Sequence, residues 1–347
     1  MLRSSRGPLT DDHDLAMLDL DGVVYVGPAA VPGAAQNLSR ARTLGLRLAF
    51  ITNNASREAS VVAQHLTELG IPAAADEVVT SAQAAARLLV DRWGQGAAVV
   101  CLGGPGLAAA LGEAGLIPVA VDAEAVAVAS GYGPDVRWAE ITRVAIRIRD
   151  GLPWVASNTD ATFPTPDGLA PGHGVLVTML SSFTGVQPLV AGKPERPLLD
   201  ETVRRTGGRR PLMVGDRLDT DIAGAHRAGM ASLLVLTGVT GLPELVAARP
   251  DERPTYLAPD LAGLVEAHAA PVRATPGRAG STAGWAAGGW SARVDDGRLV
   301  LDPTAPDAAV DDWWRAAAAA AWEHLDASGD VVDISDLDVP DPTPPAR

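Results

Sequence analysis

Hydrophobic and polar positions along the chain predict short strands that are each followed by a helix. The apolar run at 15–18 reads as a buried strand, and residues 31–44 have the spacing of a helix. Strands are also expected at residues 46–51, 97–102, 125–129, 154–156, 211–215 and 231–236. Helices are also expected at residues 58–69, 81–93, 107–114, 138–149, 175–183 and 220–228. Strands that alternate with helices in this way predict an α/β fold with parallel sheets.

Two acidic residues follow directly on the first predicted strand. Asp19 and Asp21 are two positions apart, and residues with that spacing in an extended segment point to the same side. Two carboxylates so placed repel each other unless a cation or a shared proton joins them. Asp-x-Asp-Gly is also common turn chemistry at the end of a strand, so the pair alone leaves a purely structural role open.

More acidic residues follow the predicted strand at 211–215. Asp216 stands directly after it, and Asp219 and Asp221 come shortly afterwards. If this strand neighbours the first one, Asp216 and Asp221 converge on the first acidic pair at the carboxyl ends of the sheet, where such folds bind ligands. An all-oxygen site of this kind suits Mg²⁺, whereas zinc prefers His or Cys ligands. Asp219 is better interpreted as a cap of the following helix.

Composition limits the classes of function. The chain has 347 residues, 47% of them hydrophobic, which is enough for about two or three domains with their own cores. A single cysteine and the lack of a signal-like start favour the cytoplasm. No apolar stretch approaches the roughly 20 residues of a membrane span. With a net charge of −14 and scattered basic residues, neither a membrane nor a nucleic acid is an expected partner.

Lys193 is the only lysine among 28 basic residues. A chain that uses Arg at its other basic positions can keep Lys where a compact charge on a flexible stem is needed, although chance survival at the surface is the alternative. The glycine cluster at 103–106 lacks the Gly-x-Gly-x-x-Gly spacing, so no dinucleotide site is expected there.

Four separated motifs, taken in order, resemble those of the haloacid dehalogenase superfamily. They are Asp19-Leu-Asp21-Gly22, Thr52-Asn53-Asn54, Gly192-Lys193-Pro194 and Gly215-Asp216-Arg217-Leu218-Asp219-Thr220-Asp221. The long insert between the second and third motifs looks like a C2 cap, which is typical of subfamily IIA with its NagD-like, p-nitrophenyl phosphatase-like and phosphoglycolate or glycerol 3-phosphate phosphatase-like members. The resemblance covers residues 12–265, and the chain looks like an actinobacterial member with a C-terminal extension.

The resemblance implies a Mg²⁺-dependent phosphomonoesterase with a Rossmann-like core. Asp19 would be the nucleophile that forms an aspartyl-phosphate, and Asp21 would serve as general acid and base. Thr52 would bind phosphoryl oxygens, and Lys193 would neutralise the developing charge. The implied metal ligands are Asp19, the main-chain carbonyl of Asp21, and Asp216, with Asp221 holding the metal's water molecules. The implied substrate-binding residues are Gly22, Asn53, Asn54, Tyr132, Asn158 and Asp160.

The resemblance also implies a substrate class and part of a domain plan: the core would comprise residues 1–82 and 189–265, with the cap at 83–188. Beyond the resemblance, composition predicts a linker at 266–283, a small α+β module at 284–337 and a flexible tail at 338–347. Substrate choice would lie in the cap, where His173 either lines the cap interface or is a helix-start histidine satisfied by hydrogen bonds. The expected substrate is a small phosphorylated metabolite, with glycerol 3-phosphate and 2-phosphoglycolate as first candidates. A homo-oligomer through the cap or the C-terminal module is compatible with this plan.

The C-terminal stretch departs from the rest of the chain. Residues 261–347 hold fourteen acidic residues against six arginines, and they include five tryptophans that a disordered tail would not need. A hairpin is expected at 294–301 around Asp296-Gly297, and a helix at 311–325. Such a module would pack against the phosphatase or against a second subunit.

Two other functions remain open at this stage. One is a phosphotransferase or mutase that uses the same aspartyl-phosphate. The other is a non-catalytic sensor of a phosphorylated metabolite that acts through the C-terminal module.

Overall fold

A computed structural model describes residues 1–165, 168–274 and 284–341. The chain forms two compact units, the first made of Met1–Leu48 and Arg209–Arg347 and the second of Ala49–Gly208. Each unit is built around parallel strands, so the predicted α/β class is confirmed. Within the described part of the chain, no helix has the length and apolar character to cross a membrane.

The first unit contains four parallel strands in the order β15-β14-β13-β1. All four residues of β1 are buried, which explains why its sequence is continuously apolar rather than alternating. The strands are β1 (Leu15–Leu18), β13 (Pro211–Gly215), β14 (Ala231–Val235) and β15 (Tyr256–Ala258), with a short hairpin of β2 (Tyr25–Val26) and β3 (Ala29–Ala30). The helices are α1 (Leu9–Asp12), α2 (Ala34–Thr43), α9 (Ala223–Ala228) and α10 (Leu242–Val246), with 3-10 turns at Pro250–Glu252 and Leu261–Leu264.

Two predicted helices of this unit differ at their starts. The helix expected at 31–44 begins only at Ala34, because Gly33 has a left-handed backbone with φ of 77° that a helix cannot include. The helix expected at 220–228 is preceded by a π-helical turn at Leu218–Ile222, and α9 continues from there.

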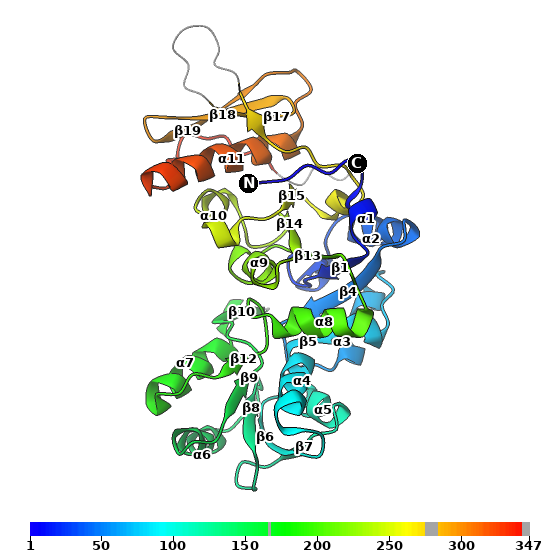
Figure 1. Ribbon diagram of the computed structural model, residues 1–347, viewed down its shortest axis with the longest axis vertical. Helices are drawn as coiled ribbons and strands as arrows, with labels where there is room; N and C mark the ends of the chain where they lie inside the picture. The colour runs from blue at the N-terminus through cyan, green and yellow to red at the C-terminus, as the bar shows by residue number, and fades with distance from the viewer. Residues whose placement is uncertain (166–167, 275–283, 342–347) are drawn as a thin grey trace. The chain divides into compact units, whose positions relative to one another are not determined.

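The second unit contains a five-stranded parallel sheet in the order β12-β9-β8-β6-β7. Helices α4 and α5 lie on one side of this sheet and α6 and α7 on the other (Figure 1). The strands are β6 (Ala98–Leu102), β7 (Ile117–Val119), β8 (Ala127–Ser130), β9 (Trp154–Ala156) and β12 (Leu189–Val190). The helices are α3 (Ala59–Glu68), α4 (Ser81–Trp93), α5 (Pro105–Glu113), α6 (Trp138–Arg149), α7 (His173–Thr184) and α8 (Pro197–Thr206), with a 3-10 turn at Ala75–Glu77.

Four more strands complete this part of the chain. Strand β4 (Arg47–Thr52) pairs in parallel with β5 (Val78–Thr80). Strands β10 (Thr162–Thr165) and β11 (Gly168–Pro171) form an antiparallel hairpin. Neither β5 nor this hairpin was predicted from the sequence.

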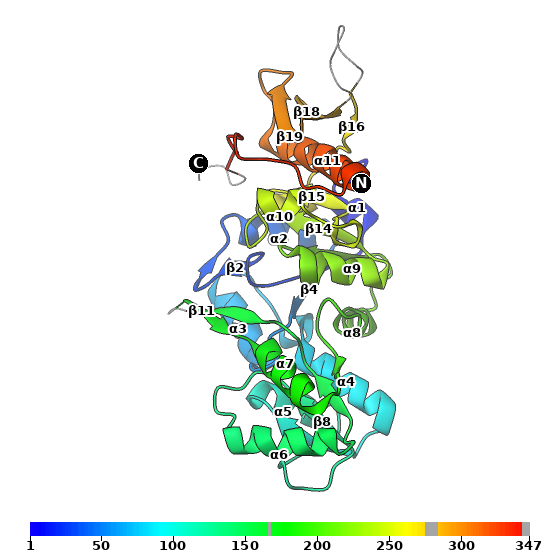
Figure 2. The same ribbon diagram turned by 90° about the vertical axis from the view of Figure 1, so that its left-hand side faces the viewer.

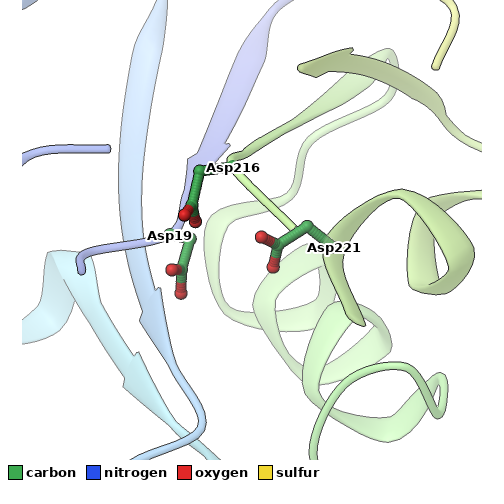
Figure 3. Close-up of side chains that lie close together, drawn as sticks. All are labelled: Asp19, Asp216 and Asp221. Atoms are coloured by element: carbon green, nitrogen blue, oxygen red, sulfur yellow. The ribbon is translucent and has the colours of Figure 1, made fainter. Parts of the chain in front are cut away.

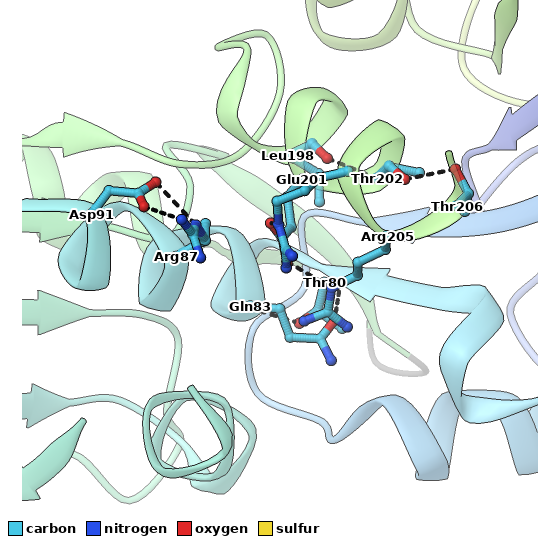
Figure 4. A network of polar contacts seen from close by, with 10 residues as sticks. Thr80, Gln83, Arg87, Asp91, Leu198, Glu201, Thr202, Arg205 and Thr206 are labelled. Atoms are coloured by element: carbon cyan, nitrogen blue, oxygen red, sulfur yellow. Dashed lines mark hydrogen bonds and ion pairs between the residues drawn. The ribbon is translucent and has the colours of Figure 1, made fainter. Parts of the chain in front are cut away.

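Helices α4 and α8 carry a network of polar contacts (Figure 4). Helix α4 starts with a capping box, in which Thr80 Oγ1 accepts from the main-chain N–H of Gln83 and Gln83 Oε1 accepts from that of Thr80. On α8, Glu201 is buried and accepts hydrogen bonds from Arg204 and Arg205. Burial alone would raise the pKa of Glu201, but these two bonds outweigh it and hold the pKa below its usual value.

The C-terminal module is an antiparallel sheet covered by one long helix. Its strands are β16 (Val272–Arg273), β17 (Trp285–Ala287), β18 (Trp290–Asp295) and β19 (Arg298–Pro303), and its helix is α11 (Val310–Ser328). The expected hairpin is confirmed, since Asp296 and Gly297 both have positive φ (46° and 75°), as a tight two-residue turn requires. Of the predicted linker and tail, residues 275–283 and 342–347 lie outside the described residues.

The module packs against the rest of the first unit rather than standing apart. Trp313, Trp314 and Trp322 of α11 belong to one buried hydrophobic cluster with Leu242 and Leu245 of α10. Both ribbon views place α11 beside α10 and β15 (Figures 1 and 2). The side chain of Arg315 also donates from Nε to the carbonyl oxygen of Leu257 in β15 at 3.1 Å. The module therefore contributes directly to the core of this unit.

Truncating the tryptophan at the centre of this contact should destabilise the protein strongly. Trp322 is fully buried, its ring N–H donates to the Leu245 carbonyl at 2.7 Å, and the Arg253 guanidinium lies 5.3 Å from the ring centroid. We expect Trp322→Ala to lower the free energy of unfolding by about 3–5 kcal/mol, because it leaves a large cavity and an unsatisfied carbonyl. Calorimetry measures the effect. Trp138→Ala is the matched control, since Trp138 is 69% exposed, and an equal effect of both variants would contradict the prediction.

Candidate active site

Three carboxylates meet at the carboxyl ends of two neighbouring strands. Strands β1 and β13 pair with Leu18 opposite Val214, so Asp19 and Asp216 leave the sheet close together, and the N–H of Asp19 donates to the Val214 carbonyl at 2.9 Å. Asp221 comes from the π-helical turn that follows β13. One oxygen from each of the three carboxylates lies within 4.8 Å of the others, and the side chains face a common space (Figure 3).

The main chain around Asp216 fixes its carboxylate in place. The N–H of Val239 donates to Asp216 Oδ2 at 2.7 Å, and both the N–H and the hydroxyl of Thr240 donate to the main-chain carbonyl of Asp216. A Cβ on Gly22 or on Gly238 would lie only 2.4 Å or 1.9 Å from Asp216 Oδ2. Only glycine fits at these two positions, so this part of the chain encloses the carboxylate tightly.

Gly22 is held in the same region by a second contact. Its carbonyl accepts from the hydroxyl of Thr237, and its backbone has a φ of +85°, which disfavours any side chain. Asp221 is anchored by the N–H of Arg217, which donates to its Oδ2 at 3.1 Å. Thr237 and Thr240 were not predicted as site residues, although both follow the carboxyl end of β14, the same signal that identified Asp19 and Asp216.

The donor set fits a hard divalent cation. The cluster consists of carboxylate oxygens alone, and Asp216 and Asp221 are fully buried while Asp19 is half-buried. Three carboxylates this close repel each other strongly unless a cation or protons balance them. Oxygen ligands of this kind match Mg²⁺. Asp21 is exposed and does not belong to this group of three carboxylates, and its expected role as a metal ligand through the main-chain carbonyl stays a prediction.

A second group of predicted site residues lies together within the second unit. Thr52 ends β4 and is followed by Asn53, while Lys193 follows β12; all three are buried. The side chain of Asn53 donates to the Lys193 carbonyl at 3.0 Å and accepts from the Lys193 N–H at 2.8 Å. Thr52 Oγ1 accepts from the N–H of Asn54 at 3.1 Å. Lys193 is therefore not a surface residue kept by chance.

Asn158 and Asp160 belong to the same group. Asn158 Nδ2 donates to the Asn53 carbonyl at 2.6 Å, and Asp160 Oδ1 accepts from Asn53 Nδ2 at 3.0 Å. His173 is buried at the start of α7, where its Nδ1 bonds to the carbonyl of Asn158 at 2.9 Å, as the hydrogen-bonded alternative expected. Burial lowers the pKa of His173 to about 4, so this histidine is neutral near pH 7.

Tyr132 contacts Phe163, an aromatic residue that was not predicted to belong to the site. Its ring forms an edge-to-face pair with Phe163 of β10, with centroids 4.7 Å apart. Beside it, a Cβ on Gly133 would lie 2.7 Å from the main chain of Gly103 and Gly104, so this loop admits no side chain there. Phe163 was missed because the hairpin that carries it has no clear strand periodicity.

The chain is similar to haloacid dehalogenase-like hydrolases and to several phosphatases. A family model described as haloacid dehalogenase-like hydrolase matches residues 16–117, and one described as HAD-hydrolase-like matches residues 190–264. The D-glycerol 3-phosphate phosphatase of Mycobacterium tuberculosis is 46% identical over 257 residues, which are 74% of this chain and 72% of that protein. The acid sugar phosphatase of Staphylococcus saprophyticus is 35% identical over 253 residues, or 72% of this chain and 96% of that protein.

Solved structures of phosphatases are also similar to this chain. The glycerol phosphate phosphatase from Mycobacterium tuberculosis in complex with magnesium matches with a TM-score of 0.79 and 40% identity, covering 91% of this chain and 92% of that one. The 4-nitrophenylphosphatase from Thermotoga maritima matches with a TM-score of 0.69 and 29% identity, covering 74% of this chain and 98% of that one. The first match extends well into the C-terminal part of this chain.

Proposed function

Because the chain belongs to the haloacid dehalogenase-like hydrolase family and is a Mg²⁺-dependent phosphomonoesterase, we propose that glycerol 3-phosphate is its substrate. The observation that carries the proposal is the 46% identity with a D-glycerol 3-phosphate phosphatase, taken with the carboxylate cluster of Asp19, Asp216 and Asp221. 2-Phosphoglycolate is the second candidate, since it is also a small phosphorylated compound. The enzyme is proposed to work in the cytoplasm.

The proposed chemistry divides between two neighbouring carboxylates. Asp19 attacks phosphorus, and the bond from phosphorus to the alcohol oxygen breaks to leave an aspartyl-phosphate. Asp21 protonates the departing alkoxide and then removes a proton from the water that hydrolyses the aspartyl-phosphate. Thr52 donates its hydroxyl to a phosphoryl oxygen, and the ammonium group of Lys193 offsets the charge on the phosphoryl group.

The proposed Mg²⁺ ligands are Asp19, the main-chain carbonyl of Asp21, and Asp216, with Asp221 holding water molecules of the ion. The three carboxylates fit this role by their chemistry and by their closeness within 4.8 Å. When bound, the ion would neutralise negative charge on the carboxylates and on the phosphoryl oxygens. Gly22, Asn53, Asn54, Tyr132, Asn158 and Asp160 are the residues proposed to shape the substrate site.

The proposed function is tested by phosphate release from a panel of small phosphorylated metabolites. We expect glycerol 3-phosphate to give the highest kcat/KM, and we expect EDTA to abolish release and added Mg²⁺ to restore it. The reason is that three carboxylates without a cation repel an anionic substrate. A preference for 2-phosphoglycolate would change the substrate assignment. No release from any compound would refute the proposed substrate, and transfer to an added polyol instead of water would indicate a phosphotransferase.

A homo-oligomer through the predicted cap is a further part of the proposal. Trp138 on α6 and Phe183 on α7 are 69% and 57% exposed, and Val175 and Leu169 are also exposed. Large apolar side chains exposed on one domain are candidates for contacts with a second subunit. We therefore propose that these helices, within the predicted cap, join subunits.

A further inference from the structure

The carboxamide of Asn53 pairs with the main chain of Lys193 on both sides. Asn53 Nδ2 donates to the Lys193 carbonyl at 3.0 Å, and the Lys193 N–H donates to Asn53 Oδ1 at 2.8 Å. Two residues that face each other on antiparallel strands exchange one N–H···O bond in each direction. The Asn53 side chain makes the same two bonds with the main chain of Lys193 as a neighbouring strand would. The two residues are 140 positions apart, and they are 8% and 2% exposed. Water therefore hardly competes for these bonds.

The second hydrogen of the Asn53 carboxamide and the main-chain carbonyl of Asn53 are also engaged within the second unit. The other hydrogen of Nδ2 goes to Asp160 Oδ1 at 3.0 Å. The main-chain carbonyl of Asn53 accepts from Asn158 Nδ2 and from the hydroxyl of Ser81. Both donor hydrogens of the carboxamide are therefore used, and none remains to bind a phosphoryl oxygen or the alcohol part of a substrate.

Close packing before Lys193 leaves this arrangement little freedom. A Cβ on Gly192 would lie 2.6 Å from Asn53 Oδ1 and 2.7 Å from the carbonyl oxygen of Ser157. Only a glycine lets the chain approach the carboxamide this closely. The glycine of the Gly192-Lys193-Pro194 motif thus has a specific role, since it gives the Asn53 side chain access to the peptide groups of Lys193.

We propose that Asn53 is a positioning residue, whose carboxamide fixes the main chain of Lys193 and so directs its ammonium group to the phosphoryl group. The inference rests on the proposed function, because it assigns to Lys193 the stabilisation of phosphoryl charge. A lysine stem has four rotatable bonds, and fixing its origin limits where the charge can be. Electrostatic stabilisation depends on such placement, and a displacement of about 1 Å can cost about 100-fold in rate.

Asn53→Ala tests the positioning role through kinetics. We expect kcat to fall about 100-fold and KM to change by less than about threefold, because the misplaced charge is needed most in the transition state. Asn53→Asp keeps the size of the side chain and the acceptor for the Lys193 N–H, but it loses both donors and places a second carboxylate against Asp160. We expect this variant to be at least as impaired as Asn53→Ala, and we expect Asp160→Asn in the same chain to restore part of the activity.

The single lysine provides a readout that needs no catalysis. Lys193 is the only lysine of the chain, so an NMR spectrum of protein labelled with ¹⁵N-lysine contains one main-chain amide signal, that of Lys193. This amide donates to Asn53 Oδ1, and we expect its hydrogen exchange to be at least about tenfold faster in Asn53→Ala than in the unaltered protein. Gln83→Ala is the matched control, because it removes a buried side chain of the same unit that contacts Thr80 and not Lys193. It should leave both kcat and the exchange rate within about twofold.

The outcomes separate this inference from the proposed function. Faster amide exchange together with lower kcat supports the positioning role. Lower kcat with unchanged exchange overturns it, because Asn53 would then act on the substrate directly. Faster exchange with unchanged kcat also overturns it, because the placement of Lys193 would not matter. An unaltered protein that releases no phosphate refutes the proposed function and the role of Lys193 with it, while the exchange result still shows whether Asn53 holds this peptide group.

Discussion

Asp19→Asn should lower kcat for phosphate release by at least about 10⁴-fold while the protein remains folded. Asn has the shape of Asp, but its amide lacks the negatively charged carboxylate oxygen that attacks phosphorus, so no aspartyl-phosphate forms. The N–H of residue 19 still donates to the Val214 carbonyl, and the register of β1 with β13 is unchanged. Phosphate release measures the loss, and rapid quenching with ³²P-labelled substrate should find no label on the protein.

The same substitution should leave stability unchanged or raise it in the absence of metal. One carboxylate oxygen from each of Asp19, Asp216 and Asp221 lies within 4.8 Å of the others, and removing one charge relieves repulsion among them. The thermal midpoint in EDTA should therefore be equal to or above that of the unaltered protein. A lower midpoint would mean that the lost activity reflects a damaged fold.

Asp219→Asn is the matched control for this substitution. Asp219 belongs to the same motif as Asp216, but its side chain is 60% exposed and pairs with Arg217 at 2.8 Å on the surface. An exposed pair of this kind contributes little to stability, so kcat should stay within about twofold and the free energy of unfolding within about 1 kcal/mol. Turnover that persists in Asp19→Asn would refute the role of Asp19 as nucleophile.

The sequence predicts the fold best where the local pattern is strong. Strands β1, β13 and β14 are buried apolar runs, and the hairpin at Asp296-Gly297 depends on turn chemistry between adjacent residues, so both kinds of element were found. Strands β7 and β12 have three and two residues, too few for any periodicity to show. The partner of the C-terminal module was left as either the phosphatase or a second subunit, because only tertiary contacts of Trp322 and Arg315 decide it.

The candidate site shows the same limit. Acidic residues that follow parallel strands can be placed together from the sequence, because the carboxyl ends of such strands share one edge of a sheet. The pairing of Asn53 with Lys193 could not be predicted, because the Asn53 side chain bonds to main-chain atoms. Every residue has the same main-chain atoms, so the sequence does not show which residue Asn53 contacts. Gly192 was the one available signal, because a glycine next to a candidate catalytic lysine indicates a close approach of the main chain.

Lys193→Arg should lower kcat by about 10²–10³-fold although the charge is kept. Lys193 is 2% exposed, and its main chain is fixed by Asn53, so the longer and planar guanidinium cannot bring its charge to the place of the ammonium group. Steady-state kinetics with saturating Mg²⁺ measures the effect. KM should change much less than kcat, because the charge on the phosphoryl group is greatest in the transition state.

Arg196→Lys provides the reverse exchange three residues away. Arg196 is 56% exposed and pairs with Asp200 at 3.2 Å, where solvent screens the contact, so this variant should keep kcat within about twofold. The comparison isolates position from charge, since both variants exchange the same two residue types. If Lys193→Arg were as active as Arg196→Lys, a positive charge of any shape would suffice at residue 193. Catalysis would then not explain why the only lysine of the chain stands at this position. If Lys193→Arg is impaired alone, the compact ammonium group itself is what the site requires.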